Sequence, residues 1–281
     1  MSRIVYVNGR YLAEEEARIS VFDRGFLFAD AVYEVTAVLD GRLVDYAGHV
    51  RRLERSLAEL GMAMPTGGDE LLDLHRRLVS RNGLTEGLVY LQVTRGVADR
   101  DFHYPAATPQ TLVMFTQARL LVTEKPGMRV ITLPDMRWKR RDIKTVQLLA
   151  ASMAKMAAKE AGKDDAWLVD DGWVTEGTSS NAYIVTRDDT IVTRDLSPAL
   201  LSGITRMAVL RLARETNMSI AERPFTVREA QQAKEAFATS ATAFVQPVVE
   251  IDGVTLADGQ SGPVTRRLHG LYLQECTKML I

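Results

Sequence analysis

Hydrophobic and polar positions alternate near the start of the chain, and this alternation predicts a β-hairpin followed by a long strand. Residues 4–7 and 10–12 flank Asn8-Gly9, which is the strongest short signal for a two-residue turn because both positions tolerate positive φ. Residues 31–39 (AVYEVTAVL) are rich in β-branched side chains and partly alternating, so we expect a strand there.

Helical spacing then replaces alternation. Residues 47–60 place Val50, Leu53, Leu57 and Leu60 on one face, which predicts an amphipathic helix. The first half therefore mixes strands and helices, as an α+β domain does. We also expect a second helix over 69–81 and strands over 88–94 and 111–116.

The second half repeats this mixture. Asp171-Gly172 separates two apolar runs and predicts another hairpin. We place a domain boundary near residue 120, within the stretch 117–127, which gives an N-terminal domain over 1–120 and a C-terminal domain over 121–281. The expected strands are 128–133, 166–170, 173–176 and 182–185, and the expected helices are 148–161, one running to about residue 216, and 262–279.

Composition narrows the class of protein. The 281 residues carry a formal net charge of -1, with 35 Lys+Arg against 36 Asp+Glu, which argues against a nucleic-acid or polybasic membrane binder. Cys276 is the only cysteine, so neither an internal disulfide nor a cysteine-built metal site is expected. The start of the chain has no signal-peptide pattern, and no apolar run reaches transmembrane length. We therefore expect a cytoplasmic protein that binds neither membrane nor metal.

Lys144 follows a predicted strand and precedes a predicted helix, where α/β proteins often expose a reactive side chain. Lysine is the residue that forms Schiff bases with aldehyde cofactors. From this stretch alone, a solvated lysine is the commoner explanation.

A second stretch favours a cofactor-binding lysine over a solvated one. Glu176 ends a predicted strand beside the small residues 177–181 (GTSSN), whose backbone can approach a ligand closely. Gly203 and Thr205 open a predicted helix, and free N–H groups at a helix start bind anions such as phosphate. The small residues around Ser240 are a possible second phosphate contact.

Three regions of the first half also hold candidate residues. Tyr33 lies on a strand and points either into a cleft or into the core. His49 and Arg52 share a helix face, which suits either solvent or a phosphate that accepts from the arginine fork. The long loop 95–105 carries arginine, histidine and aromatic residues, as functional loops often do.

Taken together, these stretches resemble the fold-type IV pyridoxal-phosphate enzymes, the group that holds D-amino-acid and branched-chain aminotransferases. In chain length and in the residues of these motifs, the sequence resembles the D-amino-acid aminotransferases most. The matching stretches, in family order, are 31–35 (AVYEV), 49–53 (HVRRL), 93–96 (VTRG), 142–144 (DIK), 176–181 (EGTSSN), 202–206 (SGITR) and 247–253 (PVVEIDG).

The resemblance implies a fold and a set of roles. The fold is α+β with two domains, a small N-terminal α/β domain and a larger, β-barrel-like C-terminal domain that holds the Schiff-base lysine. Lys144 carries pyridoxal phosphate and moves the substrate proton, and Glu176 pairs with the pyridine nitrogen. Arg52 holds the phosphate, and Tyr33 lies near the cofactor and the substrate carboxylate. The remaining implied cofactor contacts are Ser180, Asn181, Leu201, Gly203, Ile204, Thr205, Ser240 and Ala241. Family members are dimers whose active sites border the partner subunit, so a homodimer is implied.

The sequence departs from the family in the substrate loop. D-amino-acid aminotransferases commonly bind the substrate carboxylate with an Arg-x-His pair. Arg100 matches that arginine, but Phe102 stands two residues later and His103 one further. Neighbouring residues of an extended loop point opposite ways. Either His103 takes the histidine's part, or Phe102 favours bulky substrates, aromatic substrates or amines without a carboxylate.

The leading hypothesis is a D-amino-acid aminotransferase that passes the amino group of a D-alanine-like substrate to a 2-oxo acid, such as 2-oxoglutarate or pyruvate. Three alternatives share the implied fold: a branched-chain L-amino-acid aminotransferase, an aminodeoxychorismate lyase and an (R)-amine transaminase. A non-catalytic pyridoxal-phosphate-binding protein is disfavoured, because both Lys144 and Glu176 are present.

Overall fold

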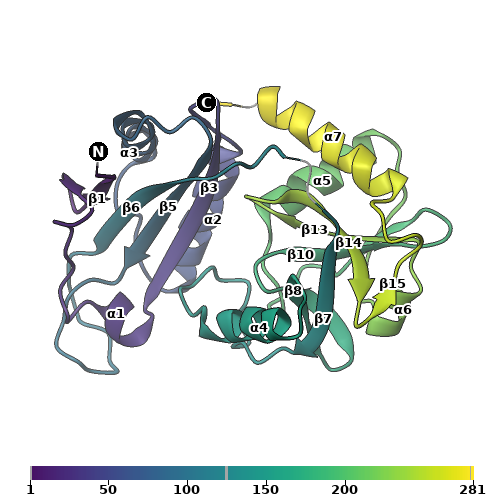
Figure 1. The fold of residues 1–281 in the computed structure, drawn as a ribbon. Helices are drawn as coiled ribbons and strands as arrows, with labels where there is room; N and C mark the ends of the chain where they lie inside the picture. Colours follow the sequence, from purple (N-terminus) through teal and green to yellow (C-terminus); the bar gives the residue numbers. More distant parts are fainter. Residues whose placement is uncertain (1, 124–125, 279) are drawn as a thin grey trace. The chain divides into compact units, whose positions relative to one another are not determined.

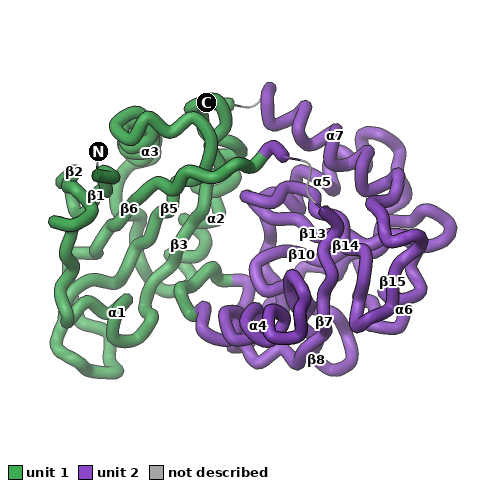
Figure 2. The backbone as a smooth tube through the Cα atoms, in the orientation of Figure 1, with its two compact units in different colours: residues 1–121, 143–147, 279–281 green, residues 122–142, 148–278 purple. Residues whose placement is uncertain are grey.

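The computed structural model describes residues 2–123, 126–278 and 280–281. The chain forms two compact units (Figure 2). Unit 1 runs to Leu121 and also contains Ile143–Gln147 and the C-terminal end of the chain, while unit 2 holds Val122–Asp142 and Leu148–Lys278. The division after Leu121 lies close to the expected boundary. The segment with Lys144, which we expected in the second domain, belongs to unit 1 instead.

Unit 1 is built on a six-stranded sheet of order β2-β1-β6-β5-β3-β4, in which every neighbouring pair is antiparallel. Asn8 and Gly9 have positive φ and join Val7 to Arg10, so the predicted hairpin turn is confirmed. The strands are β1 (Ile4–Val7), β2 (Arg10–Ala13), β3 (Ala31–Leu39), β4 (Arg42–Leu43), β5 (Gly87–Thr94) and β6 (Thr111–Ala118).

Two amphipathic helices pack on the sheet of unit 1, α2 (Tyr46–Glu59) and α3 (Gly68–Arg81). Leu53 and Leu57 of α2 and Leu71 and Leu78 of α3 are buried, as the helical spacing predicted for α2. A short helix, α1 (Arg24–Phe28), precedes β3. The Asp23 carboxylate caps it by accepting from the Gly25 N–H.

Unit 2 is built on a nine-stranded mixed sheet of order β12-β11-β10-β13-β14-β7-β8-β9, with β15 paired to β14 (Figure 1). Its strands are β7 (Met128–Pro134), β8 (Asp165–Asp170), β9 (Trp173–Gly177), β10 (Asn181–Val185), β11 (Ile191–Thr193), β12 (Ile220–Glu222), β13 (Glu235–Ser240), β14 (Phe244–Ile251) and β15 (Val254–Thr255). Its helices are α4 (Leu149–Glu160), α5 (Ile204–Glu215), α6 (Val227–Gln231) and α7 (Pro263–Lys278).

The sheet of unit 2 curls back on itself. The last strand in its order, β9, is joined to β10 by only three residues, 178–180, although β10 lies near the opposite end of the sheet. Strands β9 and β10 are also in contact. Side chains of both ends, such as Val174 and Ile184, share one core cluster with Trp167 and Phe225. This curled sheet agrees with the barrel-like second domain that the resemblance implied.

A buried carboxylate holds the start of the closing helix α7. Glu235 of β13 accepts from the Val264 N–H at 3.0 Å and from the Thr265 N–H at 2.8 Å. A Cβ at Gly262 would lie 2.0 Å from the Glu235 carboxyl carbon, so a side chain there would displace the Glu235 carboxylate. Glu235 therefore acts as a helix cap although it lies far away in sequence.

Glu235→Ala is expected to lower the free energy of unfolding by about 1–3 kcal/mol, because two N–H groups of α7 lose their acceptor inside the protein. Urea unfolding followed by circular dichroism measures this loss. The control is Glu215→Ala, which removes an exposed ion pair with Arg211 and is expected to cost less than about 0.5 kcal/mol. Equal losses in the two variants would contradict the capping role.

Candidate functional site

Lys144 lies between β7 and α4, on a segment that joins the sheet of unit 1. The Tyr33 N–H donates to the Lys144 carbonyl at 3.0 Å, and Thr145 forms a β-bridge with Val32. The Lys144 amine lies 4.1 Å from the centroid of the Tyr33 ring. The structure therefore brings together two of the predicted site residues, Lys144 and Tyr33.

A buried cluster adjoins this pair on β3 and α2. The Glu34 carboxylate accepts from Arg52 Nε and Nη2, both at 2.8 Å, and lies 2.7 Å from His49 Nδ1. Burial alone would raise the pKa of Glu34, but Arg52 and His49 outweigh it and hold the pKa at about 2. Glu34 was not among the predicted site residues, because its contacts with His49 and Arg52 form only when β3 and α2 pack together.

Arg52 was predicted to hold the cofactor phosphate. In the structure, two of its donors are directed at Glu34, which fixes the plane of the guanidinium. The phosphate role of Arg52 stays a prediction.

The charge of Glu34 is expected to make unit 1 sensitive to acid. The pKa of Glu34 in the folded protein is about 2, below its ordinary value of 4.5. The ionised group therefore stabilises the fold above pH 4.5, and this contribution is lost as the pH falls towards 2. In urea unfolding between these two pH values, Glu34→Gln is expected to lose less stability than the unmodified protein. Glu59→Gln, on the exposed side of α2, is expected to behave like the unmodified protein, and a Glu34→Gln slope equal to that of the control would contradict the prediction.

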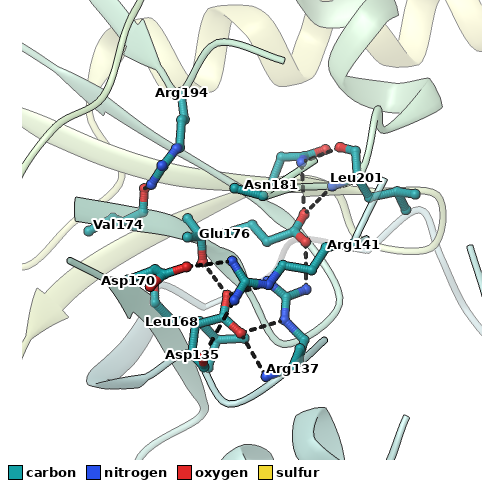
Figure 3. A network of polar contacts seen from close by, with 12 residues as sticks. Asp135, Arg137, Arg141, Leu168, Asp170, Val174, Glu176, Asn181, Arg194 and Leu201 are labelled. Carbon is teal, nitrogen blue, oxygen red and sulfur yellow. Dashed lines mark hydrogen bonds and ion pairs between the residues drawn. The ribbon is translucent and has the colours of Figure 1, made fainter. Parts of the chain in front are cut away.

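The remaining predicted cofactor residues lie in unit 2, where Asn181 and Leu201 contact Glu176 near the end of β9 (Figure 3). Its Oε1 accepts from Arg137 Nη1 at 2.6 Å, and its Oε2 accepts from Asn181 Nδ2 at 3.1 Å and the Leu201 N–H at 3.2 Å. Burial raises the pKa of Glu176, and the Arg137 guanidinium opposes that rise. Glu176, Asn181 and Leu201 were predicted, but Arg137 was not.

The predicted phosphate contacts gather at the same end of the sheet in unit 2. Asn181 pairs with Thr239, so the start of β10 lies beside the end of β13, where Ser240 and Ala241 turn the chain. Gly203 precedes α5, and a Cβ at Gly203 would lie 2.1 Å from Asn181 Oδ1. Helix α5 therefore begins against Asn181, with Ile204 and Thr205 as its first residues.

These residues suit a ligand that combines a phosphate with a basic ring. The N–H groups at the start of the twelve-residue helix α5 favour an anion. The Ser180 hydroxyl is buried and has no hydrogen-bond partner among the described residues, so it has a donor to offer. The carboxylate of Glu176 favours a protonated ring nitrogen. In unit 1, the Lys144 amine makes no ion pair with any residue that the structure describes. The phosphate and the protonated ring of pyridoxal phosphate match these donors and acceptors of unit 2, while Lys144, the predicted Schiff-base lysine, belongs to unit 1.

The predicted substrate residues lie on a loop of unit 1 that is anchored by Arg24. The Arg24 guanidinium donates to the Asp101 carbonyl at 2.7 Å and the His103 carbonyl at 3.3 Å. His103 is exposed and pairs with the Asp101 carboxylate at 3.1 Å. The Arg100 guanidinium lies 5.6 Å from the ring of Phe102, which is 78% exposed. The part that Arg100 and His103 play in substrate binding stays a prediction.

None of the helices in the described ranges is long and apolar enough to cross a membrane.

Comparisons with known proteins agree on one group. The family model described as amino-transferase class IV matches residues 31–251. A D-alanine aminotransferase from Bacillus licheniformis is 41% identical over 266 residues, covering 94% of this chain and 94% of that relative.

Solved structures show the same fold. A T.th. branched-chain amino acid aminotransferase, complexed with N-(5'-phosphopyridoxyl)-L-glutamate, has a TM-score of 0.89 and 27% identity and covers 99% of this chain and 95% of its own. The Escherichia coli branched-chain aminotransferase has a TM-score of 0.90 at 21% identity and covers 98% of this chain and 95% of its own. The predicted α+β fold class is confirmed.

Proposed function

Because the chain belongs to the aminotransferase class IV family, we propose that it is a pyridoxal-phosphate-dependent aminotransferase of D-amino acids. Membership confirms the resemblance that the motifs indicated. The observation that carries the choice of a D-amino acid is the 41% identity, over 94% of the chain, to a D-alanine aminotransferase. The amino group passes from a D-alanine-like donor to a 2-oxo acid, such as 2-oxoglutarate or pyruvate, in two ping-pong half-reactions.

Pyridoxal phosphate, when bound, supplies an aldehyde that captures amines and a ring that accepts electrons. Lys144 would hold the cofactor through its amine, and the same amine, once released, would take up and return the proton of the substrate Cα. Glu176 holds the ring nitrogen. In unit 2, Thr205 and Ser240 would bind the phosphate. In unit 1, Arg52 is the predicted phosphate ligand, and Tyr33 lies beside the Lys144 amine.

The test mixes the purified protein with D-alanine or with L-leucine, without an acceptor, and follows the visible absorbance of the bound cofactor. We expect loss of that absorbance with D-alanine only, together with stoichiometric pyruvate. Loss with L-leucine only would overturn the D-specific assignment in favour of the branched-chain group. Pyruvate released catalytically from aminodeoxychorismate would identify the lyase. A protein that acquires no cofactor absorbance after added pyridoxal phosphate would overturn the whole assignment.

A second candidate function is transamination of (R)-amines that have no carboxylate. The supporting observation is Phe102, which packs edge-on against Phe28 with 5.7 Å between ring centroids and flanks Arg100 with an apolar surface. Loss of cofactor absorbance with (R)-1-phenylethylamine, but not with D-alanine, would favour this function.

We also propose a homodimer whose active sites border the partner subunit, in the cytoplasm. Several large apolar side chains of unit 1 are exposed in a single chain, among them Phe26 at 67%, Phe102 at 78% and Tyr104 at 61%. Light scattering of the purified protein is expected to give twice the mass of the 31.2 kDa chain. A mass of one chain would overturn the dimer. The single cysteine, Cys276, suits a reducing compartment.

A further inference from the structure

The Glu176 carboxylate pairs with the guanidinium of Arg137, which also pairs with a second carboxylate, that of Asp135. Arg137 donates from Nη1 to Glu176 Oε1, and its other edge meets Asp135, with Nε 2.9 Å from Oδ1 and Nη2 2.7 Å from Oδ2 (Figure 3). The Asp135 side chain is fully buried. A bidentate pair of this kind fixes the guanidinium plane, so Nη1 can point only at Glu176.

The chain of charges continues beyond Asp135. Arg141 Nε lies 3.4 Å from Asp135 Oδ2, and Arg141 Nη1 lies 2.9 Å from Asp170 Oδ2. Acidic and basic groups alternate from Asp170 to Glu176, with three carboxylates and two guanidinium groups. Each arginine is therefore shared between two carboxylates. Glu176, at the buried end, receives only a share of one positive charge.

The sharing of Arg137 between Asp135 and Glu176 affects both the charge of Glu176 and its attraction for a further cation. A buried carboxylate without a cation becomes protonated, because burial penalises its charge. A carboxylate with a cation to itself has little attraction left for a second one. Arg137 opposes the burial penalty on the charge of Glu176, and because Asp135 shares Arg137, Glu176 keeps attraction for another cation.

We propose that Arg137 and Asp135 are positioning residues, which hold the Glu176 carboxylate ionised and fixed in orientation so that it matches a protonated pyridine nitrogen. This inference rests on the proposed function, in which the ring nitrogen of pyridoxal phosphate is the cation that Glu176 attracts. Asn181 and the Leu201 N–H occupy the other carboxylate oxygen and complete the orientation.

The test measures the ¹⁵N chemical shift of ring-labelled pyridoxal phosphate bound to the protein. We expect a protonated nitrogen in the unmodified protein and a shift towards neutral pyridine in Arg137→Gln. The dissociation constant of the cofactor is expected to rise about tenfold, because a charge-assisted hydrogen bond becomes a neutral one. Arg137→Lys keeps the positive charge and is expected to keep the nitrogen protonated.

The matched control is Asp170→Asn, at the half-exposed end of the same chain of charges, which is expected to leave both the shift and the dissociation constant unchanged. A protonated nitrogen in Arg137→Gln would overturn the proposal. So would a deprotonation of the nitrogen between about pH 6 and pH 9 in the unmodified protein, a measurement that needs no variant to fold. If labelled cofactor does not bind at all, the proposed function fails instead.

Discussion

Lys144→Ala is expected to abolish transamination, with a loss of kcat on the order of 10⁴-fold, and to remove the visible absorbance of the bound cofactor. In the proposed function both effects have one cause, because the same Lys144 amine is assigned to holding the cofactor and to moving the substrate proton. The amine is suited to both tasks, since it lies 4.1 Å from the Tyr33 ring centroid on a segment fixed by backbone pairing to β3.

The control for this variant is Lys139→Ala, which removes an exposed lysine five residues earlier. It is expected to keep the absorbance and kcat of the unmodified protein. Stopped-flow absorbance with D-alanine measures both properties in one experiment. If Lys144→Ala transaminates at the rate of the unmodified protein, Lys144 is not the catalytic residue.

Glu176→Gln is expected to lower kcat by about 10²- to 10³-fold while the cofactor still attaches to Lys144. Glutamine nearly preserves the shape of the side chain but removes the charge that favours a protonated ring nitrogen, so the ring becomes a poorer acceptor of electrons. Single-turnover rates with D-alanine measure the effect. The absorbance of the bound cofactor is expected to remain, which separates this variant from Lys144→Ala.

Loss of an arginine–carboxylate pair also destabilises a protein, so the control is Glu222→Gln. Glu222 pairs with the buried Arg206 at 2.7 Å, as Glu176 pairs with Arg137, but it lies on the edge strand β12. Glu222→Gln is expected to lower the free energy of unfolding and leave kcat unchanged. A similar loss of kcat in both variants would show that the effect of Glu176 is structural rather than chemical.

Much of the secondary structure could be predicted from local patterns. The strand Ala31–Leu39 has the bounds that its β-branched residues predicted, and α2, α3, α4 and α5 each begin and end within about three residues of the expected range. Strands β11 and β12 were missed. Each has only three residues, which is too short to show a periodic pattern.

Some residues of the candidate site could be predicted from the sequence, and others could not. Lys144 and Glu176 stand in motifs whose residues are adjacent in sequence, so the motifs could be found without knowing the fold. Arg137 was missed because its contact with Glu176 joins residues 39 positions apart. The link between Glu34 and Arg52, at 18 positions, needs α2 to pack on β3 before it exists.

The sequence by itself determined the family, the class of cofactor and most of the helices and strands, because these depend on periodicity and on short motifs. Only the tertiary structure decided that Lys144 joins the sheet of unit 1, that Glu235 holds the start of α7, and that Asp135 and Arg137 hold Glu176. Each of these is a hydrogen bond or ion pair between segments far apart in the chain. Such contacts form only when the sheets assemble, and neither hydrophobic periodicity nor residue type reveals which partner a buried charge will meet.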